Sequence, residues 1–469
     1  MEIRYTKSDD GYIAKKVGNS PKKPGNRFKL LGSRVHIDPT QLMSGWVPVS
    51  DVPNEKGKSN SGFIEMGKLS TEQQLKIFYL DVGQGDATLI ESENALVIID
   101  GGPNEGLYRY LKKRLESLRR ADEAIGLPKR DFLFINAIFI SHFDKDHYYG
   151  LVKVLKDPNF IIGTIYHNGL PRYHDFSSDK DLDLGTIINH TDGTRSISTD
   201  FTNIDSARTL LASGELLTKK GNLNYFGNFL EALVNSHDSA QQGVKSVKRL
   251  VARKPESLEI IEIGVNLKFE VLGPVTTKKT GEIRLPVFPN PHNITATNPI
   301  PAPSESYTIN GNSIVLRLTY KNVRFLFGGD LNQPAQKYLH DRYHNHLNKF
   351  TCDVNKACHH GSSDFDVEYL KDVSPKATVF SSGDDGSYDH PLPDAIGAAA
   401  KHSQGEFPLV FSTELARDTS VGGKVMLGHI NARSNGDIIV MAQKKERTSV
   451  TNPWHTFHVP FKGPFGEQH

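Results

Sequence analysis

SHFDKDHYYG, residues 141–150, directly follows the apolar run FLFINAIFI, residues 132–140, which is typical of a buried strand. Four side chains of the kinds that bind metals fall within six positions: His142, Asp144, Asp146 and His147. Carboxylates and imidazoles crowded beside a core cost free energy unless a cation neutralises them. The alternative is a charged loop that caps a helix. We favour a metal site at the end of this strand.

Four further segments also place Asp or His just after a predicted strand, which makes a helix-capping loop a poor explanation. They are ALVIID ending in Asp100, VRFLFGGD ending in Asp330, the pair His359 and His360 after DVNKAC, and His390 after ATVFSSGDDGSYD. Layered α/β folds gather their active sites at the carboxyl ends of strands. Histidine nitrogens and carboxylate oxygens suit zinc, manganese or iron, and the spacing His-x-Asp-x-Asp-His can serve two neighbouring ions. The pattern therefore predicts hydrolytic metal chemistry.

The composition is that of a globular protein of 469 residues, 37% of them hydrophobic and 23% charged, with a net charge of only +2. No stretch has the roughly 18 consecutive apolar residues that a membrane span requires, so we expect no contact with a membrane. The N-terminal residues lack an apolar signal region, and two cysteines cannot form a disulfide framework. We therefore expect a cytoplasmic location.

The pattern of strands and helices divides the chain in two. Residues 1–70 predict a small β-rich module, with an SH3-like barrel as one form, and residues 53–62 resemble a linker. Residues 71–469 alternate strands and helices as one large α/β domain. A polar insertion at about 167–260 interrupts this domain and predicts helices at 206–217 and 225–250.

Several motifs in one order resemble the metallo-β-lactamase fold superfamily and, within it, the hydrolase domain of the competence protein ComEC. They run from about residue 75 to residue 441: IFYLDVGQGDATLIES, ALVIIDGG, SHFDKDHYYG, LKFEVLGP, NGNSIVLRLTYKNVRFLFGGD, KACHHGSSDF and GSYDHPLP. The superfamily pattern is His-x-His-x-Asp-His, whereas this chain has Asp144 at the second histidine, as ComEC-like members do. The resemblance implies a four-layer αββα sandwich of the α/β (α+β) class. It also implies two divalent ions, zinc or manganese, and the carboxylate favours manganese more than an all-histidine pocket would.

The resemblance also implies the metal ligands and, for three of them, a catalytic role. The metal set is His142, Asp144, Asp146, His147, Asp330, His360, His390 and Asp100, and the catalytic set is Asp146, His360 and His390. His142 and Asp144 would hold one ion, Asp146 and His147 would hold the other, and Asp330 would bridge them. Asp100 would lie close to the metals or orient a ligand. Of His360 and His390, one would complete the metal shell and the other would contact the scissile phosphate, and spacing alone does not decide which.

The predicted function is that of a metal-dependent nuclease or phosphodiesterase acting on DNA or RNA. Lysines such as Lys245, Lys248 and Lys254 would attract phosphate. ComEC's membrane channel is missing, so transport is not implied. Two alternatives remain open. One is a metallo-hydrolase of a small ester, lactone or amide. The other is a non-catalytic protein with a vestigial site, whose N-terminal module binds a protein partner.

Overall fold

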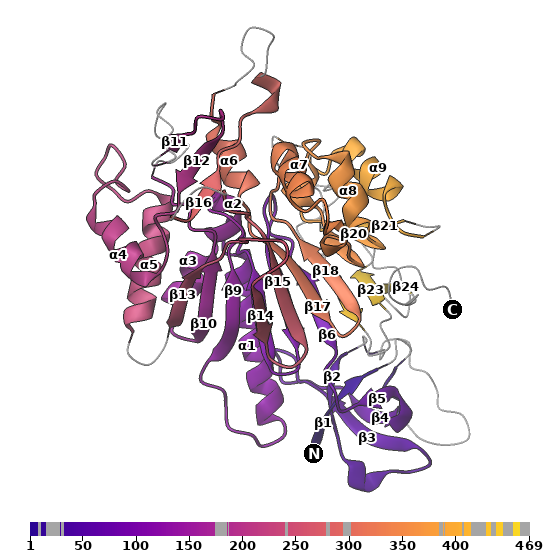
Figure 1. The fold of residues 1–469 in the computed structure, drawn as a ribbon. Coiled ribbons are helices and arrows are strands. Elements are labelled where there is room, and N and C mark those ends of the chain that lie inside the picture. Colours follow the sequence, from indigo (N-terminus) through magenta and orange to yellow (C-terminus); the bar gives the residue numbers. More distant parts are fainter. Residues whose placement is uncertain are drawn as a thin grey trace.

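In the computed structural model, two β-sheets face each other and helices cover their outer faces (Figure 1). The structure describes residues 1–7, 11–15, 29, 32–173, 185, 187–239, 243–277, 282–293, 302–383, 388, 390–405 and 408–413. It also describes the backbone of three later strands, residues 428–432, 438–443 and 454–459. Within these residues, no helix combines the length and the apolar character needed to cross a membrane.

The first main sheet has nine strands and contains the apolar run that precedes the opening motif. Its order is β13 (Val244–Arg249), β10 (Phe160–His167), β9 (Leu133–Phe139), β8 (Ala95–Ile99), β7 (Thr88–Ser92), β6 (Leu75–Tyr79), β22 (Gly428–Ala432), β23 (Ile438–Gln443) and β24 (Trp454–Val459). Strands β8, β9, β10 and β13 run parallel to one another. Their carboxyl ends therefore meet at one edge of the sheet.

The second main sheet has seven strands and packs face to face against the first. Its order is β14 (Ile260–Ile263), β15 (Leu267–Gly273), β17 (Val315–Tyr320), β18 (Val323–Phe327), β19 (Val354–Lys356), β20 (Ala377–Phe380) and β21 (Leu409–Ser412). Strands β18 to β21 are parallel. Buried side chains of both sheets form one core between them, in which the rings of Phe139 and Phe269 lie 5.0 Å apart. Burial of this apolar surface holds the two sheets together.

Helices cover the outer face of each main sheet. The nine-stranded sheet carries α1 (Gly106–Glu123), α3 (Leu151–Lys156), α4 (Ile204–Ala212) and α5 (Tyr225–Asp238). The seven-stranded sheet carries α7 (Gln333–Arg342), α8 (Val367–Val373) and α9 (Pro393–Lys401). In α1, for example, Leu107, Leu111 and Leu115 recur at every fourth position and pack on the sheet. The predicted αββα sandwich is confirmed.

The described strands within the first 70 residues form a separate five-stranded antiparallel sheet with its own small core. Its order is β4 (Ser61–Glu65), β3 (Trp46–Asp51), β2 (Arg34–Ile37), β1 (Glu2–Thr6) and β5 (Leu69–Ser70). Arg34 joins it to the main sandwich through an ion pair with Asp122 near the end of α1. Figure 1 shows this sheet at the opposite end of the sandwich from the short helix α2 (Lys145–Tyr148). The division into two domains stays a prediction.

Two local expectations differ from the structure. Residues 53–62 are not a linker, because they connect the paired strands β3 and β4. The helix predicted at 225–250 ends at Asp238, and β13 follows as an edge strand. The reason is tertiary, because residues 244–249 pair with β10, while the three-residue spacing of buried Val244 and Val247 does not by itself indicate a strand.

The insertion and the Pro-rich loop contribute further elements. A small sheet joins β11 (Ile187–Asn189), β12 (Arg195–Ser198) and β16 (Arg284–Pro286). The loop before β17 also contains α6 (Glu305–Gly311), which the sequence pattern did not indicate and which Ser304 caps through the backbone N–H of Tyr307. This helix lies close to the metal-ligand segments.

Candidate metal centre

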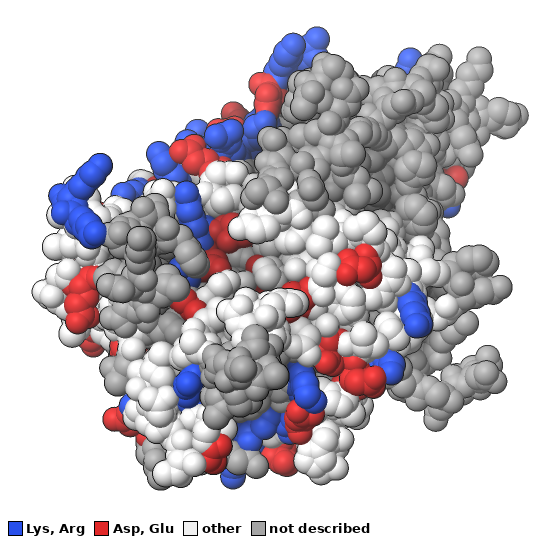
Figure 2. All heavy atoms as spheres, turned by 90° about the horizontal axis from the view of Figure 1, so that it is seen from above, with Lys and Arg blue, Asp and Glu red and all other residues white. Residues whose placement is uncertain are grey.

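The five segments with predicted site residues all lie at one end of the sandwich. Asp100 follows β8, His142 follows β9, Asp330 follows β18 and His360 follows β19. Because these strands run parallel within each sheet, their carboxyl ends bring the segments together. Figure 2 looks onto this end, where acidic side chains lie near the middle and many Lys and Arg side chains lie toward the edges.

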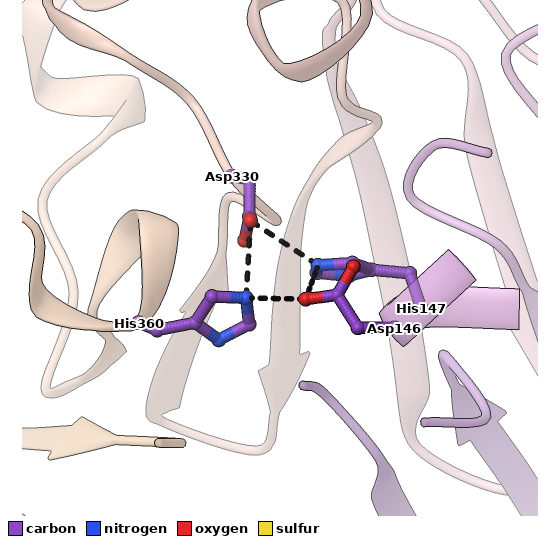
Figure 3. Close-up of side chains that lie close together, drawn as sticks. All are labelled: Asp146, His147, Asp330 and His360. Atoms are coloured by element: carbon purple, nitrogen blue, oxygen red, sulfur yellow. Dashed lines mark ion pairs between the residues drawn. The ribbon is translucent and has the colours of Figure 1, made fainter. Parts of the chain in front are cut away.

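Four side chains converge so closely that one cation could contact them all (Figure 3). The Oδ2 atom of Asp330 lies 3.2 Å from Nε2 of His147 and 3.1 Å from Nε2 of His360. The Oδ2 atom of Asp146 lies 3.2 Å from the same nitrogen of His360 and 3.9 Å from that of His147. We call these four residues the four-ligand cluster. Two nitrogens and two carboxylate oxygens are a donor set that zinc and manganese accept.

The ring of His147 is held in place by Asp100. Oδ2 of Asp100 lies 3.0 Å from Nδ1 of His147, which leaves Nε2 directed into the four-ligand cluster. The same carboxylate accepts hydrogen bonds from the backbone N–H and the hydroxyl of Ser141, each at 2.7 Å. Asp100 itself has φ = +59°, an uncommon backbone conformation for a residue other than glycine. A carboxylate behind a metal-binding imidazole is the usual arrangement for fixing its orientation.

The ring of His360 is oriented in a similar way from the other sheet. Its Nδ1 lies 2.8 Å from the carbonyl oxygen of Ser381, which follows β20, so Nδ1 carries the proton and donates it. Nε2 is then the nitrogen that faces Asp146 and Asp330. His359 and His360 both have φ near +50°. Such strained backbone is typical of functional sites.

The atoms that face the cluster fit a cation. Nε2 of His147 and Nε2 of His360 are buried, and neither has a hydrogen-bond partner among the described residues. Burial would lower the pKa of both imidazoles, but the neighbouring carboxylates, Asp330 foremost, raise each pKa well above its usual value. Burial would raise the pKa of Asp330, and the two imidazoles instead lower it well below its usual range. The site thus favours positive charge at its centre.

His142 and Asp144 lie beside the cluster and not in it. Nε2 of His142 is 3.8 Å from Oδ2 of Asp144, and its Nδ1 is 3.0 Å from the hydroxyl of Ser141. The other carboxylate oxygen, Oδ1, accepts a hydrogen bond of 2.6 Å from Arg172. Burial would raise the pKa of Asp144, but Arg172 and His142 lower it to about 2. Among the described residues, this pair offers a second ion fewer ligand atoms than the four-ligand cluster offers the first.

His390 also lies outside the four-ligand cluster. The centre of its ring is 6.4 Å from that of His360, and its Nδ1 is 3.2 Å from the side-chain nitrogen of Gln84. His359 lies on the same side, with its ring centre 6.1 Å from that of His390. Between the two late histidines that the sequence left undecided, the structure brings only His360 to the other ligands.

Asp86 and Lys356 form a buried ion pair beneath the cluster. Burial would raise the pKa of Asp86, but Lys356 and the neighbouring imidazoles lower it below its usual range. Asp86, Asp100 and Nδ1 of His147 form a second close group. Its carboxylates are already bound by Lys356 and Ser141, so we regard it as the layer that supports the ligands.

Sequence reasoning missed three charged residues of this region: Lys356, Arg172 and Glu305. For Lys356 the sequence gives no clear signal, since its short strand, Val354–Lys356, contains only one apolar residue. Arg172 stands in an irregular segment and Glu305 in the first turn of α6, and charged residues are ordinary in both places. Their importance arises from contacts between residues 28 and 133 positions apart, which local patterns do not reveal.

Comparison with known proteins agrees with this architecture. Residues 80–197 match the family model described as "Metallo-beta-lactamase superfamily". No curated protein matches the chain.

Among solved structures, the chain is similar to the metallo-beta-lactamase fold protein YhfI from Bacillus subtilis, with 10% identity, 72% of this chain and 97% of that chain covered, and a TM-score of 0.31. It is also similar to a diphosphatase from the PhnP family, with 11% identity, 72% and 94% coverage and a TM-score of 0.31. The metallo-beta-lactamase SMB-1 has 14% identity, 62% and 83% coverage and a TM-score of 0.25. These remote similarities do not bear on the substrate.

Proposed function

We propose a function from one premise, that the chain carries a metallo-β-lactamase superfamily domain. It acts as a metal-dependent hydrolase, and its substrates are phosphodiesters of DNA or RNA. The observation that carries the proposal is the convergence of Asp146, His147, Asp330 and His360 from both sheets. A divalent ion held there would lower the pKa of a water molecule and stabilise charge on a phosphate oxygen.

The residues around the ion have separable tasks. Asp100 and the carbonyl of Ser381 fix the two imidazoles, so the ligands need little rearrangement when an ion binds. The side chain of Asp146 is 30% exposed, whereas the other three ligands are nearly inaccessible. Asp146 therefore stands where substrate and water arrive, and we assign it the acceptance of a proton from the attacking water. To His390, which lies beside the cluster, we assign the contact with the phosphate.

Two features favour a phosphodiester over a carbon ester. The ordered motifs resemble the ComEC hydrolase domain, including the aspartate at position 144. In addition, Lys245 and Lys248 are exposed on the edge strand β13, and Lys254 is exposed just after it. Because β13 runs parallel to β10 and β9, its carboxyl end lies at the same end of the sandwich as the four-ligand cluster. A polyanion bound at the ligands could extend over these lysines.

The number and identity of the ions are part of the proposal. The four-ligand cluster supports one ion directly, and His142 with one oxygen of Asp144 is the position for a second. Two carboxylates and two imidazoles accept manganese as well as zinc.

A substrate screen tests the function. The purified chain is freed of metal with a chelator, reloaded with Mn²⁺ or Zn²⁺, and assayed on single-stranded DNA, duplex DNA, RNA, bis(p-nitrophenyl) phosphate, p-nitrophenyl acetate and a simple lactone. We expect metal-dependent cleavage of the phosphodiesters. Cleavage of the ester or lactone alone would instead establish the small-substrate hydrolase. No cleavage with any metal would point to a partner-binding protein with a vestigial site.

Any variant that replaces a ligand histidine needs a matched control in this screen. His237→Ala serves this purpose, because His237 lies at the end of α5, pairs with exposed Asp238 and has no role in the cluster. Its activity should equal that of the unaltered chain.

A further inference from the structure

The two candidate metal positions differ in how many ligands the protein offers. The four-ligand cluster brings two nitrogens and two carboxylates within reach of one cation. The second position, between His142 and Asp144, joins Nε2 of the histidine to Oδ2 of the aspartate across 3.8 Å. No third His, Cys, Asp or Glu among the described residues completes a group with this pair.

His142 is nevertheless prepared for a ligand. Its Nδ1 lies 3.0 Å from the hydroxyl of Ser141 and 3.2 Å from that of Ser313. Its Nε2 is buried and has no hydrogen-bond partner in the part of the chain that the structure describes. A fully buried imidazole nitrogen without a hydrogen bond costs free energy unless something binds it. His142 therefore offers one unpartnered nitrogen to a ligand at the second position.

Arg172 is built into this second position. It is only 6% exposed, and Nη1 of its guanidinium lies 2.6 Å from Oδ1 of Asp144 while Nη2 lies 3.1 Å from Oε1 of Glu305. The backbone carbonyl of Arg172 accepts a hydrogen bond of 3.0 Å from the side chain of Asn224. Asn224 is itself buried and caps α5. Contacts within the fold thus fix the position of the guanidinium.

The position of the Arg172 charge differs from that of Lys356, which is also buried at the site. Lys356 lies 3.9 Å from Asp330, but its own ion pair is with Asp86, which is outside the four-ligand cluster. Arg172 instead pairs with Asp144, one of the two groups that would bind the second ion. A divalent cation at Oδ2 of Asp144 would lie on the same carboxylate as the guanidinium and would be repelled by it.

We propose that Arg172 keeps the second metal position weak, so that the chain holds one ion tightly in the four-ligand cluster and takes up the second only at higher metal concentration. The inference rests on the proposed function, because it concerns the same site. The guanidinium supplies part of the positive charge that a tightly bound second ion would otherwise provide. Activity that requires the second ion would then follow the free metal concentration.

The experiment measures metal binding and not catalysis. Metal-free protein is titrated with Mn²⁺, and free Mn²⁺ is quantified by its electron paramagnetic resonance signal. The unaltered chain should show one tight ion and a second that binds at least about tenfold more weakly, or not at all in the range measured. Two ions of equal affinity would overturn the proposal. His142→Ala should remove the weak class and leave the tight one.

Arg172→Gln is the decisive variant, and Arg172→Lys is its matched control. Glutamine removes the charge but keeps donor groups, so the second ion should bind at least about tenfold more tightly than in the unaltered chain. Lysine keeps the charge and should leave the second ion weak. Unchanged or weaker binding of the second ion in Arg172→Gln would overturn the proposal.

Glu305→Gln tests the same idea from the other partner of Arg172. It leaves the guanidinium less compensated and should weaken the second ion further, by about threefold or more. Thermal melting would reveal whether Arg172→Gln folds. If it does not, Glu305→Gln still tests the proposal, and unchanged binding of the second ion in Glu305→Gln would contradict it. Absence of the tight ion from the unaltered chain would instead defeat the proposed function, so the two failures are distinguishable.

Discussion

Asp100 places Oδ2 3.0 Å from Nδ1 of His147, on the side of the ring away from the four-ligand cluster. The two residues follow neighbouring parallel strands, β8 and β9, so the fold itself sets this contact. The carboxylate fixes the tautomer in which Nε2 has a lone pair for a cation. Asp100 thus holds the ring of His147 from the side opposite the four-ligand cluster.

Asp100→Asn should weaken metal binding without abolishing it. An amide can still accept a hydrogen bond from Nδ1 of His147 but lacks the negative charge that makes Nε2 a stronger donor. Loss of such a supporting carboxylate typically costs about 10- to 100-fold in metal affinity. Mn²⁺ titration of the variant measures the effect. An affinity equal to that of the unaltered chain would show that Asp100 only shapes a turn.

The exposed lysines on and after β13 should govern binding of nucleic acid but not chemistry on a small substrate. Replacing Lys245, Lys248 and Lys254 with Gln should weaken the binding of single-stranded DNA and reduce its dependence on salt. Cleavage of bis(p-nitrophenyl) phosphate should stay the same, because that substrate is too small to reach them. Fluorescence anisotropy at several salt concentrations tests this prediction. An unchanged salt slope would place the nucleic acid elsewhere.

His167 predicts how the fold responds to acid. Its ring stacks on Phe201 at 3.8 Å between centroids, and neither ring nitrogen has a hydrogen-bond partner among the described residues. Burial, with a smaller effect of the Arg249 charge, lowers the pKa of His167 to about 3. As the pH falls below about 6.5, His167 therefore takes up a proton in the unfolded chain but stays neutral in the folded chain. The contribution of neutral His167 to the free energy of unfolding is fully present above pH 6.5 and is lost progressively as the pH falls toward 3.

His167→Phe removes this proton uptake while preserving an aromatic ring against Phe201. At pH 5 the histidine should cost the unaltered chain about 2 kcal/mol relative to pH 7.5. When the pH is lowered from 7.5 to 5, the free energy of unfolding of the unaltered chain should therefore fall by about 2 kcal/mol more than that of the variant. Denaturant unfolding at both pH values measures it. A difference that does not change with pH would mean that His167 is protonated in the folded chain.

The sequence was sufficient for the architecture and for most side chains near the candidate metal centre. Asp146, His147, Asp330 and His360 combine a metal-ligand residue type with a place just after a strand, and both properties can be read locally. The four-layer sandwich was expected because the ordered motifs resemble the metallo-β-lactamase superfamily, whereas the pattern of strands and helices alone indicated only a layered α/β domain. These are features that short stretches of sequence determine.

The remaining features depend on contacts between distant segments. Arg172 is significant only because the insertion returns it to Asp144 and because α6 brings Glu305 to its other side. The carbonyl of Ser381 orients His360, and a backbone atom leaves no trace in the residue type. The end of α5 was missed because Val244 and Val247 have a spacing compatible with a helix, and only pairing with β10 makes residues 244–249 a strand.

The most direct test of the central claim compares the unaltered chain with Asp146→Ala. This variant removes one ligand of the four-ligand cluster and the most exposed of its side chains, and it leaves the core between the sheets intact. We predict that it loses the tightly bound Mn²⁺ and all metal-dependent cleavage of phosphodiesters while its thermal unfolding in the metal-free state stays the same. An Asp146→Ala protein that retains the ion and cleaves at the normal rate would contradict the account.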